Sequence, residues 1–88
     1  MKIDPQYKVR DVVGEKVVLI QGSEPGDLSR VVALNDTSFY LWEALYGKEF
    51  ELTDIVALLT ARYDVEESVA LADATQWVET FKNCGVII

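Results

Sequence analysis

Side chains able to carry out acid–base or nucleophilic chemistry are scarce in this 88-residue sequence. It contains no histidine, the residue that serves most often as a general base and as a metal ligand. Its one cysteine, Cys84, comes near the expected end of a helix, where the helix dipole disfavours a thiolate. Gly22 and Gly26 flank an acidic Ser-Glu-Pro with no lysine nearby, which excludes a P-loop. The sequence therefore predicts no catalytic residue and a chain that is not an enzyme.

Carboxylates are the remaining groups that could bind a metal, because the chain has fifteen acidic residues. A metal site needs clustered Cys, His or converging carboxylate ligands. The acidic pairs Glu49/Glu51 and Glu66/Glu67 are more simply explained as solvated surface charges. We therefore expect no metal site and no cofactor.

Asp73 differs from the other carboxylates in its position. It comes one residue before Ala74 and four before Trp77, at the border of an expected apolar helix face. Two interpretations carry equal weight. Asp73 is either a boundary carboxylate hydrogen-bonded to a neighbouring helix or a polar contact in a groove.

The distribution of charge argues against nucleic-acid binding. The net charge is −7, yet residues 1–33 hold five basic and five acidic residues, so the whole excess lies in residues 34–88, with three basic and ten acidic. A nucleic-acid binder needs cationic side chains that displace phosphate counterions. The second part of the chain would instead repel a phosphate backbone.

Length and composition indicate one domain over residues 1–88, with residues 1–6 as a loose lead-in. Half of the residues are hydrophobic, which is enough for one core. No apolar run approaches the length of a membrane span, and a single cysteine fits a reducing compartment. We expect a cytoplasmic protein with no membrane contact.

The first part of the chain favours strands. Partial alternation over residues 7–13 and β-branched runs over residues 16–21 and 29–34 predict three strands. Gly14-Glu15 is expected to form a type II′ hairpin turn, and residues 22–27 form a turn cluster rich in Gly and Pro. Two successive hairpins make a three-stranded antiparallel meander.

The chain changes character at Asn35, a good N-cap for a helix that Gly47 can end. Asp36 places negative charge at the positive end of that helix. We expect its apolar face to be formed by Phe39, Leu41, Trp42 and Leu45, with Trp42 at the centre of the core.

Two more helices follow. Thr53 is expected to cap a helix over residues 54–63, with Ile55, Leu58, Leu59 and Tyr63 on its inner face. A longer helix is expected from Glu66 to about Cys84, ended by Gly85, with an apolar stripe of Ala70, Ala74, Trp77, Val78 and Phe81. Residues 86–88 form an apolar tail that closes the core. Strands followed by helices in separate runs give an α+β fold, a three-stranded antiparallel sheet followed by a three-helix bundle.

A three-stranded meander has two edges, and no segment of the sequence supplies a fourth strand beside residues 29–34. An uncovered edge is a hazard that proteins usually blunt, so a retained edge favours a binding function. The alternative is that a terminal segment of the chain covers it.

Residues spread over positions 9–88 share an order and spacing with a known family: Leu34-Asn35-x-Thr37, Leu41-Trp42, Leu45, Gly47, Leu58-Leu59, Tyr63-Asp64-Val65, Asp73, Trp77-Val78, Phe81 and Gly85-Val86-Ile87. Together they resemble the coenzyme PQQ synthesis protein D (PqqD-like) family. The resemblance implies a compact fold of the winged helix-turn-helix type. It also implies a non-catalytic recognition element that chaperones a ribosomally made precursor peptide to a radical SAM or other modifying enzyme.

In that family the leader of the precursor is held as an added strand on the edge of the third strand, in a groove walled by the third helix. Strand addition gives affinity through the backbone, so specificity must come from side chains. Arg30 could pair with an acidic leader residue, and Trp77 is the expected main contributor of binding energy. The peptide-binding residues expected here are Arg30, Val31, Val32, Ala33, Leu34, Asp73, Gln76, Trp77 and Thr80.

Two alternatives remain. A winged-helix DNA-binding domain would show salt-sensitive DNA binding, which the acidic helices disfavour. A structural subunit of a larger enzyme complex would bind the enzyme tightly and no leader. The exposed edge also permits a homodimer through paired sheet edges.

Overall fold

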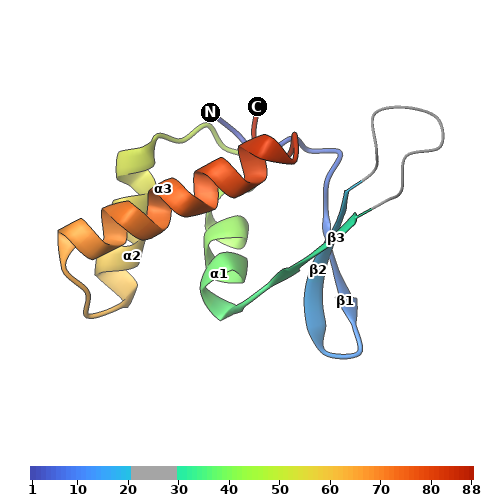
Figure 1. Ribbon diagram of the computed structural model, residues 1–88, viewed down its shortest axis with the longest axis horizontal. Coiled ribbons are helices and arrows are strands. Elements are labelled where there is room, and N and C mark those ends of the chain that lie inside the picture. Colours follow the sequence, from blue (N-terminus) through green and yellow to red (C-terminus); the bar gives the residue numbers. More distant parts are fainter. Residues whose placement is uncertain (21–29) are drawn as a thin grey trace.

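The computed structural model describes residues 1–20 and 30–88 and shows an α+β fold (Figure 1). Three strands precede three helices: β1 (Val9–Val12), β2 (Glu15–Ile20), β3 (Arg30–Leu34), α1 (Asp36–Leu45), α2 (Leu52–Arg62) and α3 (Glu67–Asn83). This order confirms the predicted sheet followed by helices. The turn expected over residues 22–27 lies outside the described residues.

The strands form one antiparallel sheet in the order β1-β2-β3. Val9 pairs with Val18, and Val18 in turn pairs with Val32. Because side chains alternate between the two faces of a strand, Val18 and Ile20 are buried while Leu19 between them is exposed. The inner face of the sheet therefore packs against the helices.

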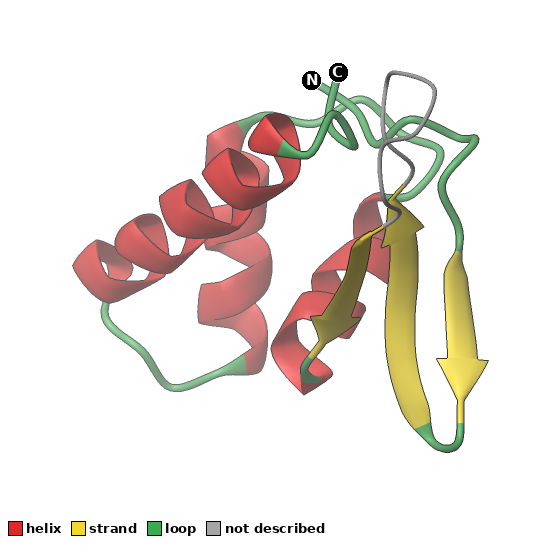
Figure 2. Ribbon diagram, turned by 45° about the vertical axis from the view of Figure 1, so that its right-hand side comes forward, coloured by secondary structure: helices red, strands yellow, loops and turns green. Residues whose placement is uncertain are grey.

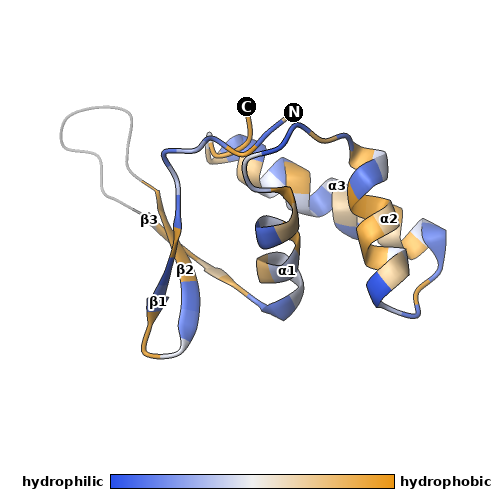
Figure 3. Cartoon of the chain, turned by 180° about the vertical axis from the view of Figure 1, so that it is seen from behind, coloured by the Kyte–Doolittle hydropathy of each residue, from blue (hydrophilic) through white to orange (hydrophobic). Residues whose placement is uncertain are grey.

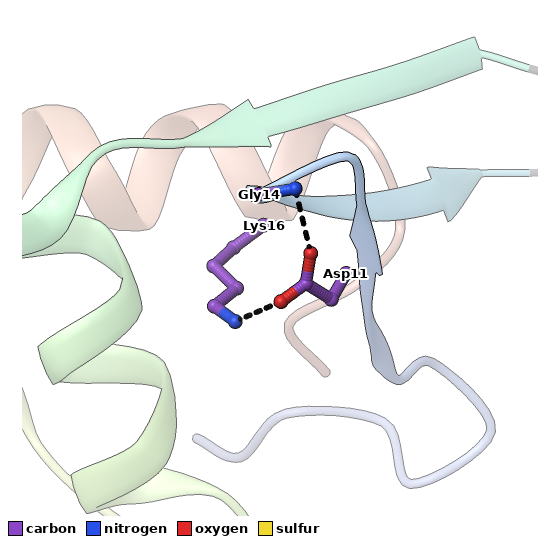
Figure 4. Close-up of polar contacts among 3 residues, drawn as sticks. All are labelled: Asp11, Gly14 and Lys16. Carbon is purple, nitrogen blue, oxygen red and sulfur yellow. Dashed lines mark hydrogen bonds and ion pairs between the residues drawn. The ribbon is translucent and has the colours of Figure 1, made fainter.

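The first hairpin turn lies one residue earlier than predicted. Val12 pairs with Glu15, so the turn residues are Val13 and Gly14, with φ of 52° and 85°. Two positive φ values are typical of a type I′ turn, and the prediction of a type II′ turn at Gly14-Glu15 is wrong. Asp11 stabilises the turn, because its carboxylate accepts hydrogen bonds from the Gly14 amide and the Lys16 ammonium (Figure 4).

Helix α1 begins as predicted. The Asn35 side chain accepts a hydrogen bond from the Ser38 amide at 2.8 Å, which satisfies a donor of the first turn. Trp42 is buried with only 4% of its surface exposed, together with Leu41 and Leu45, whereas Phe39 is half-buried. The helix therefore contributes one apolar face to the core.

Helix α2 begins at a different cap from the one predicted. Its N-cap is Glu51, and Glu51 and Asp54 form a reciprocal capping box in which the Glu51 amide donates to Asp54 Oδ2 at 2.7 Å. The prediction that Thr53 caps this helix is wrong, because Thr53 lies inside the first turn. Ile55 and Leu59 are buried as expected.

Helix α3 has the predicted buried stripe: Ala70, Ala74, Trp77, Val78 and Phe81. Its end is a Schellman motif around Gly85, whose φ is 77°. The Gly85 amide donates to the Lys82 carbonyl and the Val86 amide to the Phe81 carbonyl. Val86 and Ile87 are buried beside this end and close the core as expected, whereas Ile88 is exposed.

The N-terminal residues are held in the core. Ile3 is 1% exposed and pairs with Ile87 in an antiparallel bridge, and Lys2 pairs with Glu49. The amide and carbonyl of Lys2 also exchange hydrogen bonds with Ile88. The expectation of a loose lead-in over residues 1–6 is therefore wrong for residues 1–4.

The sheet and the α2–α3 pair lie at opposite ends of the molecule, with α1 between them (Figures 1 and 2). Each helix carries hydrophobic and hydrophilic positions in turn (Figure 3), as expected for helices that pack on one side. The two chain ends lie side by side (Figure 1). This arrangement leaves β3 at the edge of the sheet that is nearer to α3 (Figure 2).

Candidate functional site

A groove of about 380 Å³ lies between β3 and α3. The three β3 residues in its lining are Val32, Ala33 and Leu34, and α3 forms the facing wall. Helices α1 and α2 complete the groove, which the following residues line: Val32, Ala33, Leu34, Asn35, Thr37, Ser38, Leu41, Leu59, Asp73, Gln76, Trp77, Thr80 and Phe81.

The outer edge of β3 has no partner strand among residues 1–20 and 30–88. β3 pairs with β2 on one side only, and the sheet ends there. The N-terminal segment pairs with residues 49 and 87 and does not reach β3. Alternate residues of this edge therefore direct backbone N–H and C=O groups away from the sheet.

The α3 wall combines an apolar base with a polar rim. Trp77 and Phe81 are buried, whereas Asp73, Gln76 and Thr80 are exposed. The Thr80 hydroxyl donates to the Gln76 carbonyl at 2.9 Å, so its proton is used within the helix. The exposed carboxylate of Asp73 and the exposed amide of Gln76 complete the polar rim.

Aromatic rings connect the wall to the core. The Trp77 and Phe81 ring centroids are 5.0 Å apart, and Phe81 makes an edge contact with Trp42 at 5.8 Å. The indole Nε1 of Trp77 is buried and has no hydrogen-bond partner among the described residues. A buried donor without an acceptor is unfavourable by about 1–3 kcal/mol, so the groove wall carries an unused polar group.

At the α1 end of the groove, Thr37 connects the lining to α2. Its hydroxyl donates to the Tyr63 hydroxyl at 3.3 Å, and this hydrogen bond is the main cause of a lowered pKa for Tyr63. The Arg62 guanidinium lies over the Tyr40 ring at 4.4 Å, and the Tyr40 and Tyr63 rings meet edge to face. These contacts hold α1 and α2 together at that end.

Of the residues predicted for the site, seven line one groove: Val32, Ala33, Leu34, Asp73, Gln76, Trp77 and Thr80. Val31 belongs to β3 but does not line the groove, and 62% of its surface is exposed. Arg30 is the first residue of β3, and its side chain lies outside the described part of the structure. The predicted juxtaposition of β3 and α3 is thus present, whereas binding by these residues stays a prediction.

The groove residues from α1 and α2 were not predicted from the sequence. Thr37 and Ser38 follow β3 within four residues, and this proximity was the available signal. Leu59 and Phe81 were assigned to the core alone, although both also line the groove.

The model of the coenzyme PQQ synthesis protein D (PqqD) family matches residues 15–87, which is most of the chain. The chain belongs to the PqqD family. PqqD proteins are non-catalytic accessory proteins, and membership is consistent with a peptide-binding partner in PQQ-type biosynthesis. No curated protein and no solved structure matches the chain significantly.

Two further observations concern the described residues. They contain no group of three or more His, Cys, Asp or Glu side chains placed to hold a metal ion. None of the helices they form has both the length and the apolar character needed to cross a membrane.

Proposed function

We propose that this protein is a peptide-binding chaperone of the cytoplasm. In this proposal it holds the leader of a ribosomally made precursor peptide as an added strand on β3. It then presents the peptide to a modifying enzyme, of the radical SAM type or another. The observation that carries the proposal is the unpaired outer edge of β3 beside the groove with α3.

The chemistry of the groove supports an extended peptide as the guest. Backbone groups of β3 offer hydrogen bonds that any extended peptide can complete, which gives affinity with little sequence preference. Leu34, Leu41 and Trp77 offer an apolar base for side chains that point toward α3. Membership of the PqqD family supports the same kind of partner.

The first test is an NMR titration of the protein with the leader of a precursor encoded beside its gene. We expect amide shifts in residues 30–34 and 73–80. Shifts confined to other regions would contradict the proposal. Tight binding to the neighbouring enzyme without any leader binding would favour a structural subunit, and salt-sensitive DNA binding would favour a nucleic-acid function.

The second test examines strand addition without altering the protein. A series of leader peptides is made in which one backbone amide at a time is N-methylated. Because alternate amides of an added strand donate to β3, we expect affinity to fall at every second position and to change little between them. Equal losses at all positions would show that the peptide binds in another conformation.

The same edge of β3 also allows two copies of the chain to pair. We propose that such a homodimer competes with the leader, because both use the same backbone groups. In sedimentation experiments, leader binding should then shift dimers toward monomers with bound peptide. Dimers that bind leader without dissociating would exclude pairing through β3.

A further inference from the structure

The groove has a negative side chain at its rim and no positive one among the described residues that line it. Asp73 is the one charged residue in this lining, and its side chain is exposed. It forms no ion pair with any described cation, because the one salt bridge of the described residues joins Lys16 to Asp11. The charge of Asp73 is therefore available to a guest.

The three cations of the helical half lie elsewhere. Arg62 is held over Tyr40, at 4.4 Å from the ring centroid. Lys48 follows α1 and lines a different hollow, with Glu49 and Asp54. Lys82 is nine residues beyond Asp73 on α3, which corresponds to about 13 Å along the helix. None of these three described cations therefore neutralises the rim.

The spacing of residues along α3 and along an added strand limits how many guest side chains can reach Asp73. Residues of β3 and α3 line facing sides of the groove, and the two elements run in opposite chain directions (Figures 1 and 2). An added strand directs every second side chain toward the helix, at a spacing of about 6.6 Å. Asp73 and Trp77 are four residues apart, or about 6 Å along α3. In an added strand that follows α3, one inward-facing guest residue would lie at Asp73 and the next near Trp77.

From this geometry we infer that Asp73 is a specificity-determining residue and that the guest carries Lys or Arg at the inward-facing position opposite it. The inference rests on the proposed function and adds the chemistry of the guest. A basic side chain would form an ion pair with the carboxylate at the rim. An acidic side chain would be repelled by Asp73 and by the net negative charge of residues 34–88.

The test uses a library of random twelve-residue peptides displayed on phage, selected against the full chain and three variants. With the unaltered protein we expect Lys or Arg to be enriched at one position. With Asp73→Asn this preference should vanish, and with Asp73→Lys it should change to Asp or Glu. Exchanging the enriched basic residue for Gln should weaken binding to the unaltered protein by about fivefold, as for a partly exposed ion pair.

Glu79→Lys is the matched control. Glu79 is also an exposed acidic residue of α3, but it does not line the groove. The control makes the same change of net charge as Asp73→Lys, and we expect it to leave the selected peptides unchanged. A change in the selected peptides as large as the change caused by Asp73→Lys would show a general charge effect and would overturn the inference.

The two proposals fail differently. Peptides that bind with a period-two response to N-methylation, but without a basic preference at any position, would overturn the role of Asp73 alone. The absence of any enriched peptide, or enriched peptides that leave the amides of residues 30–34 unshifted, would overturn the proposed function and this inference with it.

Discussion

The carboxylate of Asp11 lies 2.6 Å from the ammonium of Lys16, across the hairpin that joins β1 to β2. Its other oxygen accepts from the Gly14 amide at 3.0 Å (Figure 4). One side chain thus connects both strands and the turn between them. Both hydrogen bonds lower the pKa of Asp11, and the one with Lys16 is the larger cause.

The lowered pKa of Asp11 predicts a pH dependence of hairpin stability. A carboxylate with a lower pKa in the folded state stabilises the fold above its unfolded pKa of about 3.9, and this contribution is lost as the pH falls through the folded value. We expect Asp11→Asn to be less stable than the unaltered protein at pH 6. Urea unfolding from pH 6 to pH 2 should show the two curves converging in acid. A constant difference at all pH values would exclude this linkage.

Val13 predicts a stabilising substitution. A β-branched residue with φ of 52° is strained, and its side chain is 99% exposed, so it gains no burial in return. Val13→Asn should raise the free energy of unfolding by about 1 kcal/mol, because Asn-Gly suits a type I′ turn. Val13→Thr keeps the branched side chain and serves as the control. Thermal unfolding of both variants checks the prediction, which fails if Thr stabilises as much as Asn.

The capping box of α2 predicts unequal effects of two neighbouring substitutions. Asp54→Ala removes the acceptor of the Glu51 amide and should lower stability by about 1 kcal/mol. Thr53→Ala should change stability by less than about 0.5 kcal/mol, because surface substitutions away from such contacts have small effects. Urea unfolding compares them. A larger loss for Thr53→Ala would mean that the helix begins where its sequence first indicated.

The burial of Ile3 predicts that the N-terminal segment contributes to global stability. Ile3→Ala should lower the free energy of unfolding by about 2–4 kcal/mol, since the site is enclosed in the core. Lys2→Ala, next to it and exposed, is the control and should have little effect. Equal melting temperatures for the two variants would show that residues 1–4 detach without disturbing the core.

The sequence predicted those parts of the fold that depend on local periodicity. The stripe from Ala70 to Phe81 repeats at helical spacing, and every member of it is buried. Asn35 caps α1 because a single side chain and an adjacent amide determine that contact. The groove between β3 and α3 was expected from the resemblance to the PqqD-like family, and helical spacing then predicted which α3 residues face it.

The parts that sequence reasoning missed depend on distant partners or on competing local choices. Ile3 is one apolar residue in a polar segment, and only its pairing with Ile87 explains its burial. The turn moved to Val13 because strand register outweighed the preference of Val for negative φ. Glu51 rather than Thr53 caps α2 because the carboxylate of Asp54 reaches back to it. Leu41 and Leu59 were missed as groove residues because their apolar side chains also suit a core.

The pairing of Lys2 and Ile3 with the last residues has a practical consequence for rearranging the chain. A short glycine–serine linker can join position 88 to position 1 without crossing the groove, and new ends can be opened at the exposed hairpin tip. Such a circular permutant would keep every strand and helix. It would also place an attached fluorophore or fusion partner at the tip of the hairpin, away from the outer edge of β3.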